Sequence, residues 1–136
     1  MRLIIDSNEY IFAFGPLKEL TARNLFERLL TKVSIHTIRM PRTIFEEVKR
    51  NLSAEAFQEF NEFIRALTTI DEDIVVPFEI AFKYEHSGLK SADAFIAAYT
   101  EWAGADVLVT ENRHFLSRHA DLPFKVLTAE RCLKLI

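Results

Sequence analysis

Acidic side chains stand beside several predicted elements of the chain, and acids in such positions can hold a divalent metal ion. Asp6 directly follows the apolar run at residues 3–5, and Asn112 follows a second apolar run. Glu47 and Asp93 lie in the first turns of two predicted helices. Mg²⁺ and Mn²⁺ prefer oxygen ligands, and acids gathered in one cleft repel each other without a cation. Their convergence would therefore favour a metal that activates water for attack on a phosphate.

Each of these residues also has a structural interpretation. Asp6 would serve as the N-cap of a short following helix, and Asp93 would favour the dipole of its own helix. Glu47 would be a solvated charge on a helix surface, and Asn112 an ordinary turn residue. Taken one residue at a time, these alternatives stay open.

Neighbouring polar residues would support the acids. Ser7 and Asn8 would hold Asp6 or metal-bound water, and Thr110 would lie at the opening of the same cleft. Glu111 would either turn inward beside Asn112 or point away. Cations that would contact nucleic acid, each with an ordinary solvated charge as its alternative, flank the acids in sequence: Lys49, Arg50, Lys90, Arg113 and His114.

The elements that must position these residues alternate between strand and helix. Apolar runs predict strands at residues 3–5, 106–110 and 124–128, and alternating apolar and polar residues predict one at 33–38. Helical spacing and capping residues predict helices at 16–32, 41–52, 53–67, 77–88, 91–104 and 128–136, with a helix or turn at 111–119 and a short apolar run at 73–76. This alternation predicts a three-layer α/β/α sandwich with a mostly parallel central sheet, as a single domain over residues 1–136.

Composition narrows the class of protein. The chain has 136 residues, a formal net charge of −3 and one cysteine, Cys132, which excludes disulfide frameworks and clustered-thiolate zinc sites. The mild negative charge argues against a generic basic surface for nucleic acid. Because no apolar run approaches the roughly 20 residues of a membrane helix and no signal-like stretch is seen, we expect a soluble cytoplasmic protein without membrane contact.

The four positions together resemble a known family. The segments "LIIDSN", "IFEEVKRNL", "KSADAFIAAYTEWAGADVLVTENRHF" and "FKVLT" look like a PIN domain, the nuclease family that includes VapC-type toxins, across essentially the whole chain. The resemblance implies metal-binding acids at Asp6, Glu47 and Asp93. Asn112 stands where many members carry an aspartate; its amide could offer a carbonyl oxygen or hold a metal-bound water, but it carries no charge. The number of metal ions, one or two, is therefore left open.

The resemblance also implies an activity. It predicts an Mg²⁺- or Mn²⁺-dependent endoribonuclease that cleaves single-stranded or loop RNA and leaves a 5′-phosphate and a 3′-hydroxyl, such as the toxin of a toxin–antitoxin pair. An antitoxin protein would cover the cleft or insert a cation into it. Small PIN domains commonly pair, and the aromatic residues of "FQEFNEFI" exceed what one helix face needs, so we expect a homodimer through helices near residues 41–67.

A different class of function remains in competition. A PIN-like module that binds RNA or a protein without cutting, or that cuts only weakly, would explain the missing acid at Asn112. The set of Asp6, Glu47 and Asp93 favours the enzyme, because a binding module has no reason to concentrate charge of the same sign as its nucleic-acid ligand.

Overall fold

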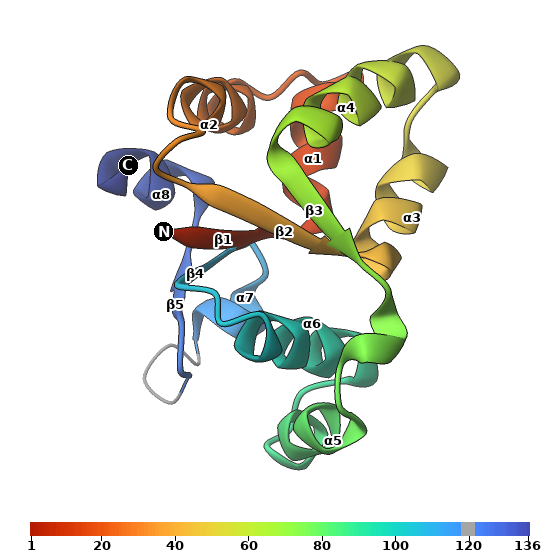
Figure 1. Cartoon of the computed structure of the whole chain (residues 1–136), viewed down its shortest axis with the longest axis vertical. Helices are drawn as coiled ribbons and strands as arrows, with labels where there is room; N and C mark the ends of the chain where they lie inside the picture. Colours follow the sequence, from red (N-terminus) through yellow and green to blue (C-terminus); the bar gives the residue numbers. More distant parts are fainter. Residues whose placement is uncertain (118–121) are drawn as a thin grey trace.

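The computed structural model describes residues 1–117 and 122–136 and shows a parallel sheet between two layers of helices (Figure 1). The sheet has five strands in the order β3-β2-β1-β4-β5, and every neighbouring pair is parallel. The strands are β1 (Arg2–Ile5), β2 (Thr37–Pro41), β3 (Thr68–Asp71), β4 (Val107–Val109) and β5 (Lys125–Leu127). The predicted α/β/α sandwich with a mostly parallel sheet is confirmed.

The order of the strands reverses next to the first of them. From β1 the chain builds outward to β2 and β3, and it then crosses back to add β4 and β5 on the other side of β1. The residues of β1 and β4 lie in register, with Ile4 beside Leu108 and Ile5 beside Val109. In open α/β sheets such a reversal leaves a crevice outside the carboxyl ends of the two strands, which is where ligands bind.

Two helical layers bury the two faces of the sheet. One face carries α1 (Ser7–Phe14), α2 (Leu20–Thr31), α3 (Arg42–Asn51), α4 (Ala54–Leu67) and α8 (Ala129–Leu135), and the other carries α5 (Phe78–His86), α6 (Ser91–Trp102) and α7 (Arg113–Leu116) (Figure 1). Successive residues of β1 alternate between the layers: Leu3 and Ile5 belong to the first core, and Ile4 belongs to the second. The continuous apolar character of this strand follows from burial on both faces.

The aromatic residues of α4 are part of the protein's own core. Phe60 is fully buried and Phe63 is 8% exposed. The Phe60 ring lies 5.3 Å from the Tyr10 ring, and the Phe63 ring lies 5.1 Å from the Phe26 ring. The expectation that these aromatics form an exposed dimer patch is wrong, because α1 and α2 already cover them.

The element predictions fail where local pattern is weak. Helix α1 was expected only as the structural alternative for Asp6, and the helix predicted at 16–32 is shorter because residues 16–19 lead into α2. The strand predicted at 33–38 is displaced, since β2 begins at Thr37. Strand β3 was missed because only Ile70 among its residues is strongly apolar. The apolar run at 73–76 gives the 3-10 helix η1 (Asp73–Val75), which has no buried residue.

The predicted helix ends are mostly confirmed. Ser53 and Thr128 cap α4 and α8 through their hydroxyl oxygens, and Gly88 and Gly104 follow α5 and α6 with positive φ angles of 106° and 65°, which suit glycine. Ser91, expected as a cap, is instead the first residue of α6. Of the predicted turn at 111–119, residues 118 and 119 lie outside the described residues. Within residues 1–117 and 122–136, no helix has the length and apolar character required to span a bilayer.

Candidate active site

Asp6 lies at the crevice between β1 and β4 and is held there from both sides. It is the N-cap of α1, and its Oδ1 accepts a hydrogen bond of 2.8 Å from the backbone N–H of Ser7. Its Oδ2 accepts a hydrogen bond of 2.8 Å from the hydroxyl of Thr110, the residue that follows β4. The structural interpretation of Asp6 as a helix cap is therefore correct, and it does not exclude a role in a site.

The hydrogen-bonded chain continues from Thr110 to Asp93. The Thr110 hydroxyl oxygen accepts a hydrogen bond of 3.0 Å from the backbone N–H of Asn112. The side-chain amide of Asn112 donates to Oδ1 of Asp93, in the first turn of α6, at 3.2 Å. Asp6, Thr110, Asn112 and Asp93, which come from three separate parts of the sequence, therefore form one connected polar network.

Glu47 reaches this network through its charge. Burial raises the pKa of Asp6, and the carboxylates of Glu47 and Asp93 raise it further, against the opposing hydrogen bonds from Thr110 and Ser7. Glu47 itself is exposed on α3. In the part of the chain that the structure describes, no three His, Cys, Asp or Glu side chains are grouped closely enough to hold a metal ion. Glu47 and Asp93 both lie near enough to Asp6 for their charges to act on its carboxyl.

The amide of Asn112 has a defined orientation. Its Oδ1 accepts a hydrogen bond of 2.9 Å from the backbone N–H of His114 and caps α7, so its NH₂ group must face Asp93. The amide oxygen thus caps the helix, and the group that faces Asp93 is the NH₂ donor. An aspartate in this place would add charge beside Asp93, whereas Asn112 adds a hydrogen-bond donor.

The donor chemistry of the site fits a hard divalent cation. Asp6 and Asp93 supply carboxylate oxygens, and each of the oxygens engaged in a hydrogen bond keeps a further lone pair. Mg²⁺ is commonly held by one or two carboxylates with water in the remaining positions. Asp6 and Asp93 would be its ligands, with Glu47 near enough to add charge.

The residues expected to support the acids divide into two groups. Thr110 and Ser7 are buried and bond directly to Asp6, whereas Asn8 is exposed. Glu111 points away from Asn112, and its Oε2 accepts a hydrogen bond of 3.0 Å from the backbone N–H of Ala129 at the start of α8.

Sequence reasoning missed Glu9, which faces Glu111. Glu9 is only 1% exposed, and its Oε1 has no hydrogen-bond partner. Burial, followed by the proximity of Glu111, raises the pKa of Glu9 to about 9. The sequence did contain a signal for Glu9. It stands three positions after Asp6, and if Asp6 is a helix N-cap, Glu9 must lie in the first turn of that helix, beside the crevice.

The cations predicted to bind nucleic acid are all exposed, as side chains that contact a phosphate backbone at the edge of the site must be. Lys49 and Arg50 form the last turn of α3, and the Lys49 ammonium lies 5.6 Å from the centre of the Phe57 ring. Lys90 is the N-cap residue of α6, and Asp93 lies in the first turn of that helix. Helix α7 begins with Arg113 and His114 directly after Asn112.

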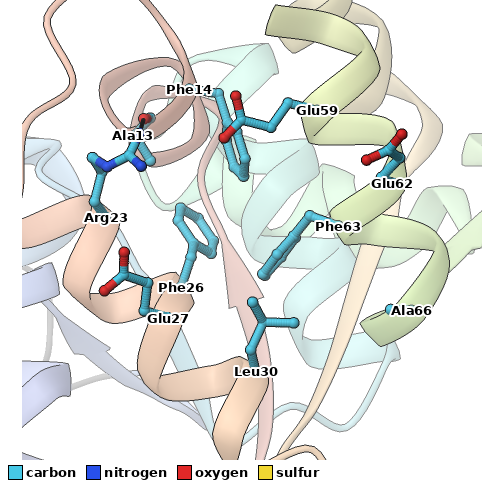
Figure 2. Close-up of a pocket in the computed structure, with 10 residues that line it drawn as sticks. All are labelled: Ala13, Phe14, Arg23, Phe26, Glu27, Leu30, Glu59, Glu62, Phe63 and Ala66. Atoms are coloured by element: carbon cyan, nitrogen blue, oxygen red, sulfur yellow. Dashed lines mark hydrogen bonds between the residues drawn. The ribbon is translucent and has the colours of Figure 1, made fainter.

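A separate apolar hollow lies between α1, α2 and α4, away from the acids. Figure 2 shows the rings of Phe14, Phe26 and Phe63 facing one another, with charged side chains around them. Its volume is about 390 Å³, and none of the predicted site residues lines it. Glu27, Glu59 and Glu62 line it, but among the residues that the structure describes they are not grouped as metal ligands, and the hollow therefore does not extend the candidate active site.

Comparison with known proteins identifies the fold. No protein-family model matches the sequence, and no curated protein is similar to it. Among solved structures, the chain is similar to a chain of the crystal structure of VapBC2 from Rickettsia felis bound to a DNA fragment from their promoter. The TM-score is 0.63 at 19% sequence identity, covering 94% of this chain and 98% of that chain. A likeness at this identity shows the fold, and the PIN-like α/β/α architecture expected from the sequence agrees with it.

Proposed function

We propose that the protein is a metal-dependent endoribonuclease that cleaves single-stranded or loop RNA, in the manner of a VapC-type toxin. The observation that carries the proposal is the placement of Asp6. Its carboxylate ends β1 at the strand-order reversal, joins Asp93 through Thr110 and Asn112, and feels the charge of Glu47. The fold shared with a chain of VapBC2 supports the same class of activity.

Each residue has a part in this proposal. Asp6 and Asp93 would hold Mg²⁺ or Mn²⁺, and Glu47 would strengthen the field that attracts the cation. Thr110 fixes the rotamer of Asp6, and Asn112 fixes that of Asp93. A bound divalent ion would supply neutralisation of the scissile phosphate and a lowered pKa of the attacking water. With a neutral residue at position 112, one metal ion is the simpler arrangement.

The RNA backbone would approach over the exposed cations beside the acids. Phosphate contacts by lysine and arginine give affinity without sequence selection, and they make binding weaken as salt increases. Lys49, Arg50, Lys90, Arg113 and His114 are the candidates for these contacts.

The likeness to a chain of VapBC2 supports a proposal that this chain has a partner protein. VapBC2 was crystallised with a DNA fragment from its promoter. We propose that this chain is similarly paired with an antitoxin that covers the acidic crevice or inserts a cation into it. Coexpression with the product of a neighbouring gene, followed by cleavage assays on the complex, would test this pairing.

A homodimer is also proposed, without an assigned face. Since Phe60 and Phe63 are buried within one chain, they no longer support an interface on α3 and α4. Light scattering at tens of micromolar would decide the oligomeric state, and a monomer would refute the proposal.

The competing function is a PIN-like module that binds RNA or protein without cutting. Asn112 favours it, because an amide replaces the acid of the resemblance and its oxygen is engaged in capping α7. Retained RNA binding with no cleavage in any divalent metal would establish this alternative.

The test of the enzyme is a cleavage assay on single-stranded and structured RNA in Mg²⁺, Mn²⁺ or EDTA. Cleavage should require the metal and should be lost in Asp6→Asn and Asp93→Asn. Glu47→Gln should lower the rate, whereas Glu46→Gln, its neighbour on the same helix, should not. Cleavage that persists in EDTA, or in Asp6→Asn, would contradict the mechanism.

A further inference from the structure

The outer side of α5 is apolar although it is exposed. Helix α5 lies at one end of the molecule, with α6 between it and the sheet (Figure 1). Its inner side supplies Tyr84, which is buried, with Ile80 and Ala81 packed against the same core. On its outer side, Phe78 and Phe82 are 74% and 47% exposed. The core of one chain therefore uses one side of this helix and leaves two phenylalanine rings in water.

The exposed apolar side chains form a patch. The rings of Phe78 and Phe82 stack with their centres 5.8 Å apart, and the His86 ring lies 4.4 Å from the Phe82 ring. Ile74 and Val75, in η1 shortly before α5, are 91% and 43% exposed. Together these five side chains make up the α5 patch. At about 200 Å² for a whole ring, the two phenylalanines alone leave roughly 240 Å² in water. Contiguous apolar patches of a few hundred Å² mark interaction sites, whereas single exposed apolar residues are ordinary.

The charges of α5 complement a second copy of the same helix. Glu79 lies in the first turn of α5, and Lys83 and His86 lie in its last turn. Two such helices packed antiparallel bring the acid of each beside the basic residues of the other. A two-fold axis perpendicular to the helix generates this antiparallel pairing, and it makes every contact twice.

Nucleic acid fits the α5 patch less well. Exposed aromatic rings can stack on bases, but Glu79 and Glu85 are exposed on the same helix, and their charge repels phosphate groups. The candidates for phosphate contacts lie instead on α3, at the start of α6 and on α7. The charge pattern therefore favours a protein surface that carries the same alternation of acid and base.

We propose that the α5 patch is the face through which two copies of this chain pair, with their α5 helices antiparallel about a two-fold axis. This inference rests on the homodimer proposed above and assigns it a face. Two patches together remove roughly 480 Å² of phenylalanine surface from water. That surface forms the apolar centre of an interface whose full size is about 1,200–2,000 Å² in a stable complex.

Light scattering over a concentration series measures the dissociation constant of the dimer and tests the face. Phe78→Ser and Phe82→Ser should each raise that constant by about 100-fold or more. Truncation of a central aromatic residue commonly weakens binding by a factor of about 30, and the two-fold axis applies the loss twice. Leu17→Ser changes a side chain that is 78% exposed between α1 and α2, and as the matched control it should leave the constant unchanged. All three side chains are exposed, so the variants should keep the circular dichroism spectrum of the wild type.

A charge exchange tests the antiparallel arrangement. Glu79→Lys and His86→Glu should each weaken the dimer, because each brings like charges together across the axis. The double variant places opposite charges together again and should recover most of the lost affinity. Double-variant affinity no better than that of the weaker single variant would refute the antiparallel pairing.

The homodimer and its face fail in different ways. A wild type that stays monomeric at tens of micromolar refutes both, and the α5 patch then belongs to a different partner. A dimer that persists unchanged in Phe78→Ser and Phe82→Ser refutes the face and leaves the homodimer. None of these results depends on RNA cleavage, so the loss of the enzymatic proposal would not alter them.

Discussion

The buried carboxyl of Glu9 should make the stability of the protein depend on pH when no metal is present. In the folded protein the pKa of Glu9 is raised to about 9 by burial and by Glu111, against an ordinary value of 4.5. The folded state therefore retains a proton that the unfolded chain releases between these two values. Because the folded state binds more protons there, the free energy of unfolding decreases as the pH rises through this interval.

The size of the effect follows from the width of the interval. Each pH unit costs at most about 1.4 kcal/mol when one proton separates the two states. Between about pH 5 and about pH 8 the wild type should lose up to about 4 kcal/mol on this account, a large part of the typical stability of a domain. Because the two glutamates interact, this pH dependence belongs to the pair.

Glu9→Gln removes the titrating group while keeping its shape and its ability to donate to Glu111. Urea denaturation in EDTA at several pH values, followed by circular dichroism, gives the free energies of unfolding for the variant and the wild type. The difference between them should grow in favour of the variant as the pH rises, since other titrating groups contribute to both proteins. Glu130→Gln, which changes an exposed acid in the first turn of α8, should show no such trend.

An invariant difference between wild type and Glu9→Gln across this range would refute the reasoning. It would show that Glu9 is ionised in the folded protein and solvated by water or a cation. A loss of stability in the variant at high pH would refute it equally, because it would mean that the ionised carboxylate stabilises the fold.

Two other substitutions, at Asp6 and Thr110, test the candidate active site, and a third, at Tyr99, tests the contact between α6 and β3. Asp6→Asn keeps the helix cap, so in chelator the variant should melt at or above the melting temperature of the wild type. In Mn²⁺ at about 100 times the dissociation constant, the wild type should gain about 2.7 kcal/mol of stability that the variant does not gain. Equal Mn²⁺-induced shifts in the melting temperatures of both proteins, with cleavage intact in the variant, would make Asp6 purely structural. Thr110→Val removes the hydroxyl that donates to Asp6 and accepts from the backbone N–H of Asn112. It should lower the free energy of unfolding in urea by about 1–2 kcal/mol and reduce cleavage. Thr110→Ser keeps the hydroxyl and should retain both the stability and the cleavage. Tyr99→Phe removes the 2.6 Å hydrogen bond that the hydroxyl on α6 donates to Asp71 on β3. The free energy of unfolding should decrease by about 2 kcal/mol. An unchanged midpoint of urea denaturation would show that this bond does not stabilise the fold.

Local sequence patterns predict the layered architecture and the edge of the sheet at which Asp6 lies. Short apolar runs such as residues 3–5 report burial on both faces of a sheet, and a polar residue directly after such a run must lie at the end of a strand. For this reason the sequence predicts that Asp6 and Thr110 lie at the carboxyl edge of the sheet. Caps such as Ser53 and Thr128 were readable because their hydroxyl groups act within a few residues of their own position.

Features that depend on contacts between distant parts of the chain could not be predicted from local sequence patterns. β3 has only one strongly apolar residue and is a strand because it pairs with β2, a partner about 30 residues earlier in the chain. The aromatic residues of α4 look like an excess on one helix, and only their contacts with α1 and α2 show that the core uses them.

Which polar groups meet depends on the three-dimensional arrangement of the elements. The order of strands places β4 beside β1, and so Thr110 reaches Asp6 across 104 positions of sequence. The amide of Asn112 faces Asp93 because the backbone of His114 claims its oxygen, which composition cannot reveal. The same strand order turns Glu111 away from the candidate site and against Glu9. Local patterns specify burial and helix ends, whereas the pairing of side chains from different elements depends on how the crossovers arrange those elements in space.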